Sequence, residues 1–387
     1  MLALMREKKP PSLAAEKLRP VARSESALFV SIATVAILIG TGKQLLENIS
    51  HPVLLLAVFL WLFVVILWSA ISVVRHADCL AIKFGEPYGT VILTLSAIAI
   101  EVAMISTAML HGANNPTLGR DAIFAVVMIA LNGLVGICLL TGGLLHREQH
   151  YNILGVNSYL NVIMALAVLG LVLPNFTTST SGPTLSALQG IFVAVTSVLL
   201  YGIFLFIQTM RHSQYFIDAK GATVASAGRC HDHKLQVRST GFHVSILLTY
   251  LFAVVFLAEK FSIPLDNFIE DFGMPQALGG AIIAALVLAP EGIGAVHATL
   301  QNQLQRSVNI LFGSVLATIG LTIPAVLVIS LATHRPIVLG VEAGNLPLLL
   351  LTLAVSVVTF ARGKTNVLQG CIHLLLFGVF VLLIFAP

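Results

Sequence analysis

The feature that most limits the fold of this 387-residue chain is a series of long apolar segments. A segment of roughly 20 apolar residues is long enough to cross the hydrocarbon layer of a bilayer as a helix. Eleven such segments are predicted, at residues 27–45, 52–73, 87–110, 120–144, 157–174, 185–208, 241–258, 275–299, 306–332, 343–361 and 366–386. The sequence therefore predicts an all-α polytopic membrane protein with about eleven transmembrane helices.

Composition excludes the main soluble alternatives. Hydrophobic residues make up 57% of the chain and charged residues 10%, whereas a soluble domain carries roughly 25% charged residues. The net charge of +4 is too small to indicate a nucleic-acid partner. The four cysteines lie far apart and form no disulfide or zinc framework. The expected partners are the lipid bilayer and small solutes, and composition leaves the oligomeric state open.

The distribution of basic residues predicts the orientation. With the eleven segments in place, 17 of the 21 Lys and Arg residues fall on one side of the membrane. The four on the other side are Lys43, Arg120, Lys260 and Arg335. Basic residues accumulate on the cytoplasmic side, so the N-terminus is expected inside. An odd number of spans then places the C-terminus outside.

A polar stretch near the middle divides the chain into two comparable halves. The predicted organisation is a cytoplasmic tail (1–26), a leading helix (27–45), a five-helix repeat (52–208), a cytoplasmic loop (209–240) and a second five-helix repeat (241–387). The two sets of five begin on opposite sides of the membrane, which is typical of inverted-topology repeats in transporters. A glycine stands 12 residues before an intramembrane glutamate in each half, as Gly89 before Glu101 and Gly279 before Glu291.

Those two glutamates are the strongest candidates for function. Each lies near the middle of the second helix of its half, among apolar and small residues. A charge at the centre of a membrane helix costs about 2.5–3.5 kcal/mol even on insertion scales, so each needs a reason. One interpretation is a permanently protonated carboxyl that bonds a neighbouring helix. The other, favoured by the symmetric placement, is a shared cation and proton site.

Neighbouring residues can supply more oxygen atoms. Pro290 and Gly292 flank Glu291 and are expected to break the helix there and free backbone carbonyls. Asn132, Ser314 and Thr318 lie in the next helix of each half. They are either further ligands or polar contacts that hold helices together. Calcium and other hard cations prefer such oxygen ligands, with carboxylates first.

One more acidic residue stands at the edge of an apolar segment. Glu86 precedes the third span on the predicted inner side. It is either an entrance that attracts cations or an exposed acid at a helix start.

Several motifs resemble a known family. Residues 77–102 and 289–318 resemble the first and second repeats of the cation/calcium exchanger superfamily. The motifs SVVRHAD (72–78), GEPYG (85–89), APEG (289–292), FGSVLATI (312–319) and TNVL (365–368) resemble its ChaA-type calcium/proton antiporter branch, which is also associated with sodium-potassium/proton exchange. The resemblance runs from about residue 65 to the C-terminus.

This resemblance implies a leading helix followed by two inverted five-helix repeats, in a bacterial inner membrane. It implies cation/proton exchange, with Glu101 and Glu291 as shared ligands and proton acceptors and with Ser314 and Asn132 at matching positions. The superfamily usually has Gly-Asn shortly before each glutamate, where this chain has Ala97-Ile98 and Val287-Leu288. Calcium, sodium and potassium therefore all stay open as the transported ion.

Other functional classes find less support. The chain contains neither the H-E-x-x-H motif of membrane metalloproteases nor a G-x-S-x-G nucleophile motif, so no enzyme and no cofactor are expected. A passive cation channel and a sodium-coupled calcium exchanger remain as alternatives.

For an antiporter, the expected mechanism follows from charge. Two carboxylates in an apolar site repel each other, so either a cation or protons must neutralise them before the helix bundle can move.

Overall fold

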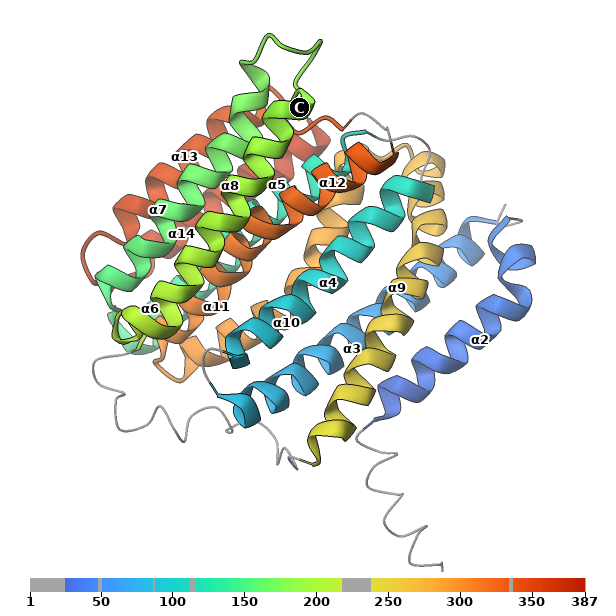
Figure 1. The fold of residues 1–387 in the computed structure, drawn as a ribbon, viewed down its shortest axis with the longest axis horizontal. Coiled ribbons are helices and arrows are strands. Elements are labelled where there is room, and N and C mark those ends of the chain that lie inside the picture. Colours follow the sequence, from blue (N-terminus) through green and yellow to red (C-terminus); the bar gives the residue numbers. More distant parts are fainter. Residues whose placement is uncertain are drawn as a thin grey trace, which may run out of the picture.

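The computed structural model describes residues 25–47, 51–85, 88–111, 116–217, 238–333 and 337–386, and most of their backbone is helical (Figure 1). The helices of the first half are α2 (Ser26–Glu47), α3 (Pro52–Phe84), α4 (Tyr88–His111), α5 (Leu118–Met128), α6 (Val135–His146), α7 (Ile153–Ala167) and α8 (Ala187–Phe206). Short π-helical or 3-10 turns continue or follow them, at η1 (Ile129–Leu134), η2 (Val168–Val172), η3 (Leu173–Asn175), η4 (Ile207–Arg211) and η5 (Ser213–Phe216).

The second half repeats this order. Its elements are α9 (Thr240–Asp271), α10 (Ala277–Leu300), α11 (Leu304–Ala317), the π-helical turn η7 (Thr318–Thr322), α12 (Ile323–Thr333), α13 (Asn345–Thr359) and α14 (Val367–Phe385). Two short strands, β1 (Gln149–His150) and β2 (Lys364–Thr365), pair in antiparallel fashion. This pair joins a connection of the first half to one of the second.

The all-α membrane architecture predicted from the sequence is confirmed. Each of the eleven predicted segments coincides with an apolar helical segment in the described ranges. Eight of these are long and apolar enough to cross a membrane, and the shorter apolar stretches are Ser26–Gly42, Val91–Thr107 and Asn345–Thr359. Many large apolar side chains remain exposed, which suits a surface that faces lipid.

Two helices are longer than predicted. The second segment was expected to end at residue 73, but α3 continues to Phe84 and has 33 residues. The seventh was expected to end at residue 258, but α9 continues to Asp271 and has 32 residues. Polar residues do not stop a helix when no breaker follows them. The stops come where glycine adopts positive φ, at Gly85 (65°) and Gly273 (61°).

The expectation that Pro290 and Gly292 break their helix is wrong, because α10 runs unbroken through both residues. Pro290 only withholds one N–H from the carbonyl of Leu286. Gly292 serves close packing, since a Cβ there would lie 2.9 Å from Cδ2 of Leu134. The irregular backbone that packs against α10 and α4 lies instead in the π-helical turns η1 and η7, at comparable places in the two halves.

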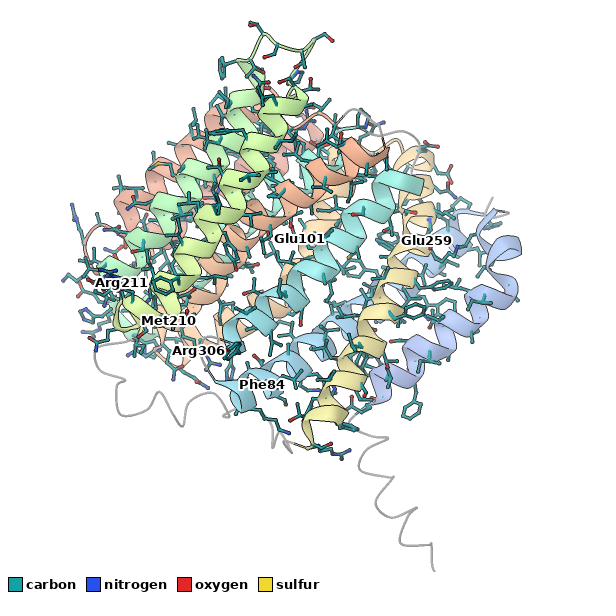
Figure 2. All side chains as sticks on the ribbon, viewed as in Figure 1. Phe84, Glu101, Met210, Arg211, Glu259 and Arg306 are labelled. Atoms are coloured by element: carbon teal, nitrogen blue, oxygen red, sulfur yellow. The ribbon has the colours of Figure 1, made fainter. Side chains whose placement is uncertain are left out.

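The helices are arranged so that the two glutamate-bearing helices lie inside the bundle. Figure 1 shows α2, α3 and α9 together at one side and α7, α8, α13 and α14 at the other, with α4, α10 and α11 between them. The first helices of the two halves, α3 and α9, pack against each other, and α4 packs against both. Figure 2 shows Phe84, Arg211 and Arg306 near the same end of the molecule, which we call the loop face.

One contact between the halves is especially close. At Gly280 of α10, an added Cβ would lie 2.7 Å from the backbone N of Ala122 in α5. Ala122 is fully buried. Only a residue without a side chain lets these two backbones approach so closely. The contact therefore leaves no open space between α10 and α5 at this level.

We expect Gly280→Ala to destabilise the protein by about 1–3 kcal/mol, because the new methyl group must push α10 away from α5. The matched control is Gly202→Ala in α8, where an added Cβ meets no atom within 4 Å. Thermal unfolding of both variants in detergent checks this. Equal melting temperatures for the two variants would contradict the packing account.

Candidate cation site

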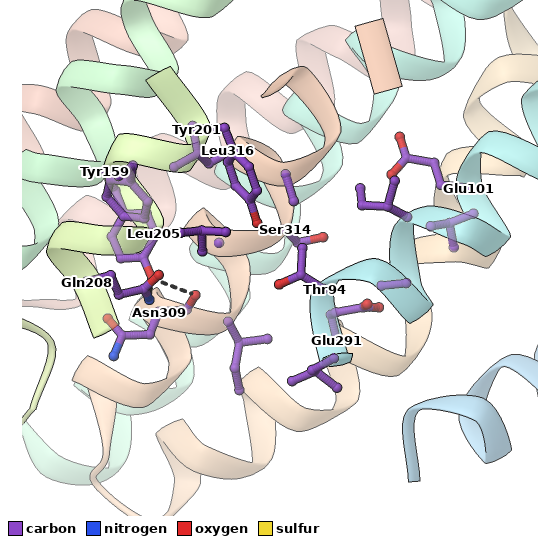
Figure 3. A pocket seen from close by; sticks show the side chains of 18 of the residues that line it. Thr94, Glu101, Tyr159, Tyr201, Leu205, Gln208, Glu291, Asn309, Ser314 and Leu316 are labelled. Atoms are coloured by element: carbon purple, nitrogen blue, oxygen red, sulfur yellow. Dashed lines mark hydrogen bonds between the residues drawn. The ribbon is translucent and has the colours of Figure 1, made fainter. Parts of the chain in front are cut away.

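A cavity of about 240 Å³ lies between α4, α8, α10 and α11, and both intramembrane glutamates line it. Figure 3 shows Glu101 of α4 and Glu291 of α10 on its wall, with Ser314 of α11 nearby. The symmetric placement expected from the sequence thus corresponds to one shared space. Apolar residues, such as Leu93, Ile98 and Val287, form much of the remaining wall.

Glu101 is held by the opposite half of the protein. Its side chain is buried, and its Oε2 accepts a hydrogen bond of 2.8 Å from Oγ1 of Thr318. Oγ1 of Thr322, four residues further along η7, is buried and has no hydrogen-bond partner among the described residues. The other oxygen of Glu101, Oε1, is buried and has no hydrogen-bond partner among the described residues. The π-helical turn η7 thus directs the hydroxyl of Thr318 at one oxygen of Glu101 and leaves the other carboxyl oxygen available.

Glu291 has a similar free oxygen. Its Oε2 is buried without a hydrogen-bond partner in the part of the chain that the structure describes. Asp78 of α3 does not line the cavity, but it lies close enough for its charge to act on Glu291. A buried polar oxygen without a partner costs free energy. Two such oxygens on one cavity indicate a place for a proton or a cation.

The other predicted ligands differ in their positions. Ser314 lines the cavity and Thr318 contacts Glu101. Asn132 does not line the cavity. Its Nδ2 donates to Oγ1 of Thr352 at 2.8 Å, and its Oδ1 lies 3.3 Å from Nδ1 of His373. Asn132 therefore joins η1 to α13 and α14, as the packing interpretation expects. Glu86 lies outside the described residues.

Polar side chains continue from the cavity toward the loop face. The hydroxyl of Tyr159 accepts a hydrogen bond of 2.6 Å from Nε2 of Gln208 and donates to the carbonyl of Asn309 at 3.4 Å (Figure 3). Arg306, which also lines the cavity, lies near the loop face in Figure 2. These residues give the cavity a polar route in that direction.

Sequence reasoning missed several residues that line the cavity or contact Glu101. They are Thr94, Tyr159, Tyr201, Gln208, Asn309 and Thr322. All six are neutral polar residues within predicted apolar spans, and that pattern occurs at many positions that only join helices. Gln208 and Asn309 gave the clearest signal, because each carries an amide near the end of a predicted span.

The donor set suits a transported cation. It combines two carboxylates with hydroxyl groups, which are the oxygen ligands that hard cations accept. Within the described ranges, no three His, Cys, Asp or Glu side chains come together in a way that could hold a metal ion. The site therefore differs from a structural metal centre built on three or four such ligands.

We expect Asn132→Ala to lower stability by about 1–3 kcal/mol, because Thr352 and His373 lose a buried partner. A bound cation is expected to raise the melting temperature of the wild-type protein. The same rise should persist in Asn132→Ala. Ser314→Ala, which changes a residue on the cavity wall, is the comparison. If Asn132→Ala abolished the cation-induced rise, the assignment of Asn132 to packing would be wrong.

Comparison with known proteins gives a consistent result. The family model described as sodium/calcium exchanger protein matches residues 54–210 and 242–386. The protein y4hA of Sinorhizobium fredii is 45% identical over 81% of this chain and 84% of its own length. The sodium-potassium/proton antiporter ChaA of Escherichia coli is 36% identical over 97% of this chain and 100% of its own.

The fold is also similar to a solved structure. The Ca²⁺/H⁺ antiporter protein YfkE has a TM-score of 0.71 at 17% identity, covering 94% of this chain and 100% of that one. This likeness shows a common fold, and the family match covers most of both halves. The chain belongs to the sodium/calcium exchanger family.

Proposed function

We propose that this protein exchanges a cation for protons across the membrane, with Glu101 and Glu291 as the shared site. The observation that carries the proposal is that each glutamate presents a buried, unpartnered carboxyl oxygen, among the described residues, beside the same cavity. Two of the three similar proteins named above support it, since ChaA is a sodium-potassium/proton antiporter and YfkE a Ca²⁺/H⁺ antiporter. Calcium, sodium and potassium are the candidate ions.

The coupling follows from charge. Two carboxylates beside one apolar cavity repel each other and are poorly solvated, so the empty ionised site is unfavourable. A cation neutralises it, and so do protons, but each displaces the other. If the bundle changes conformation only with a neutralised site, movement of the cation in one direction requires movement of protons in the other.

Access to the site is asymmetric, as alternating access requires. The cavity lies between α4 and α11, while the corresponding contact between α10 and α5 is closed at Gly280. In an inverted repeat these two contacts exchange roles between the two end states. A closed contact on one side argues against the passive channel, which would need a continuous pore.

The protein is an integral membrane protein, and its family is one of transporters. We propose a bacterial inner membrane, with the N-terminus in the cytoplasm and the C-terminus outside, from the bias of basic residues and from the ChaA relative. The loop face is then cytoplasmic. We propose that the cavity, whose lining includes Arg306 near the loop face, opens to the cytoplasmic side in this state.

Transport in proteoliposomes tests the proposal. With a pH gradient imposed, calcium, sodium and potassium are supplied separately, and uptake of each against its own gradient is measured. We expect Glu101→Gln and Glu291→Gln to reduce exchange to background, because an amide cannot ionise. Glu259→Gln is the control, since Glu259 is partly exposed, pairs with Lys260 and does not line the cavity. Normal exchange by either cavity variant would exclude this site.

Thr318 gives a graded test of the same site. A hydrogen bond to a charged group contributes about 1.5–3 kcal/mol, so Thr318→Val is expected to weaken cation affinity roughly 10- to 100-fold. Thr318→Ser keeps the hydroxyl and should retain most of the affinity. Concentration dependence of exchange measures both. An affinity that is unchanged in Thr318→Val would show that this hydroxyl does not support the site.

A further inference from the structure

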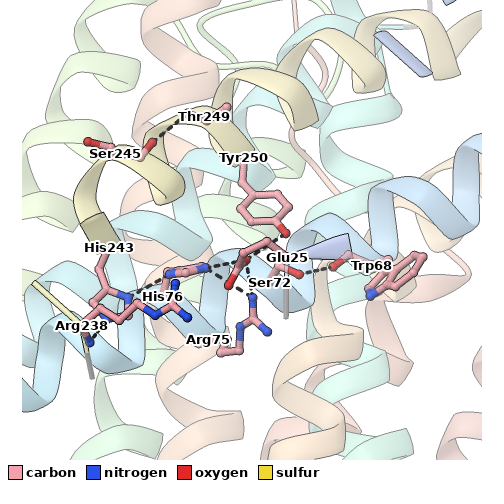
Figure 4. Close-up of polar contacts among 10 residues, drawn as sticks. All are labelled: Glu25, Trp68, Ser72, Arg75, His76, Arg238, His243, Ser245, Thr249 and Tyr250. Carbon is pink, nitrogen blue, oxygen red and sulfur yellow. Dashed lines mark hydrogen bonds and ion pairs between the residues drawn. The ribbon is translucent and has the colours of Figure 1, made fainter. Parts of the chain in front are cut away.

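A second buried polar cluster lies outside the cavity, where the segment before α2 meets α3 and α9 (Figure 4). Oε2 of Glu25 contacts Nη2 of Arg75 at 2.6 Å and Nε2 of His76 at 3.1 Å. Nδ1 of His76 lies 2.9 Å from Nδ1 of His243 in α9. Glu25 and both imidazoles are buried. Three segments that are far apart in the sequence thus meet through one pair of histidines.

The position of each proton in this cluster follows from one backbone group. The N–H of Arg238 donates to Nε2 of His243 at 3.0 Å. Because a backbone amide only donates, neutral His243 carries its proton on Nδ1. That proton faces Nδ1 of His76, which must accept it, so the proton of His76 lies on Nε2, 3.1 Å from Oε2 of Glu25. Nη2 of Arg75 lies 3.3 Å from the same nitrogen, but its shorter contact of 2.6 Å is with Oε2 of Glu25, to which it donates. The result is a directed chain of hydrogen bonds from Arg238 to Glu25.

Further side chains hold the two ends of this chain of hydrogen bonds in place. Arg75 and Tyr250 also donate to Oε2 of Glu25, at 2.6 and 3.4 Å. Lys83 of α3 donates to the carbonyl of Arg238. Among the described residues, the charged and titratable groups that contact the histidine pair or its partners are Glu25, Arg75, Lys83, Arg238 and Tyr250. Within this described set three cations surround one carboxylate, so a further positive charge has little compensation.

This chain of hydrogen bonds has no place for an additional proton. If His76 takes up a second proton, that proton must occupy Nδ1. His243 must then accept a hydrogen bond at its own Nδ1 and carry its proton on Nε2. The N–H at Nε2 of His243 would then face the backbone N–H of Arg238, so that two donors would point at each other.

We propose that His76 and His243 form a proton-binding latch at the loop face. The neutral pair holds Arg238 and the start of α9 against α3, and uptake of one proton releases Arg238.

The latch is separate from the transport site but connected to it by packing. It ties α9 to α3, and α4, which carries Glu101, packs against both helices. A fall in pH at the loop face would therefore loosen the framework beside the site through the latch, independently of proton uptake by Glu101 and Glu291. The sign is fixed by the hydrogen bonds, since the latch is closed at higher pH and opens as pH falls. This inference does not depend on the proposed exchange.

Histidine NMR tests the latch on the full-length protein in detergent, without transported cations and with a tag that lacks histidine. Selective ¹⁵N labelling of imidazoles distinguishes the two neutral tautomers and the charged form. His76→Gln and His243→Gln assign the two signals. At high pH we expect His243 protonated on Nδ1 and His76 on Nε2. On acidification the pair should take up one proton while His243 moves its own proton to Nε2.

Amide hydrogen exchange of the segment that contains Arg238 provides the second measurement. After correction for the intrinsic pH dependence, we expect the Arg238 amide to exchange roughly two- to tenfold faster once the pair is protonated, the range for loss of one net hydrogen bond. His146→Gln, which alters a histidine on α6, should leave both results unchanged. The opposite tautomers at high pH, or equal protection of Arg238 in both states, would overturn the latch.

Discussion

Two carboxyl groups with too few hydrogen-bond partners, held inside an apolar helix bundle, are the constraint on which this structure depends. Oε1 of Glu101 and Oε2 of Glu291 are buried beside the same cavity and unpartnered among the described residues. Such oxygens are costly in a low-dielectric interior unless a proton or a cation satisfies them. The hydroxyl of Thr318 stabilises one oxygen of Glu101 and leaves the other available. We infer that a proton or a cation supplies the partner that these two oxygens lack.

The packing around the two glutamates differs between the halves, and this difference determines access. Gly280 allows α10 to touch α5 at backbone distance, and Gly292 allows it to pack on Leu134. The matching surface of α4 borders the cavity instead, with polar residues leading toward the loop face. Because the two halves share the same order of helices, an exchange of these two arrangements would move the opening to the other face.

Much of the architecture could be predicted from the sequence, because membrane spans and intramembrane charges have strong signals. The eleven apolar segments and the placement of Glu101 and Glu291 beside one cavity depend on length, hydropathy and symmetry. The continuity of α10 could not be predicted, since neighbouring helices decide whether Pro290 disrupts a helix. The partners of Asn132 could not be predicted either. An amide in a membrane helix can serve a site or a packing contact, and only the positions of Thr352 and His373 distinguish them.

The central claim is that a cation and protons compete for the same two carboxyl groups. Its most direct measurement is proton release when a cation binds to the purified protein in weakly buffered detergent solution, followed with a pH-sensitive dye. The account predicts that binding releases protons from the wild-type protein and that Glu101→Gln reduces the number released per bound cation. Cation binding without any proton release, or the same release from Glu101→Gln, would contradict it.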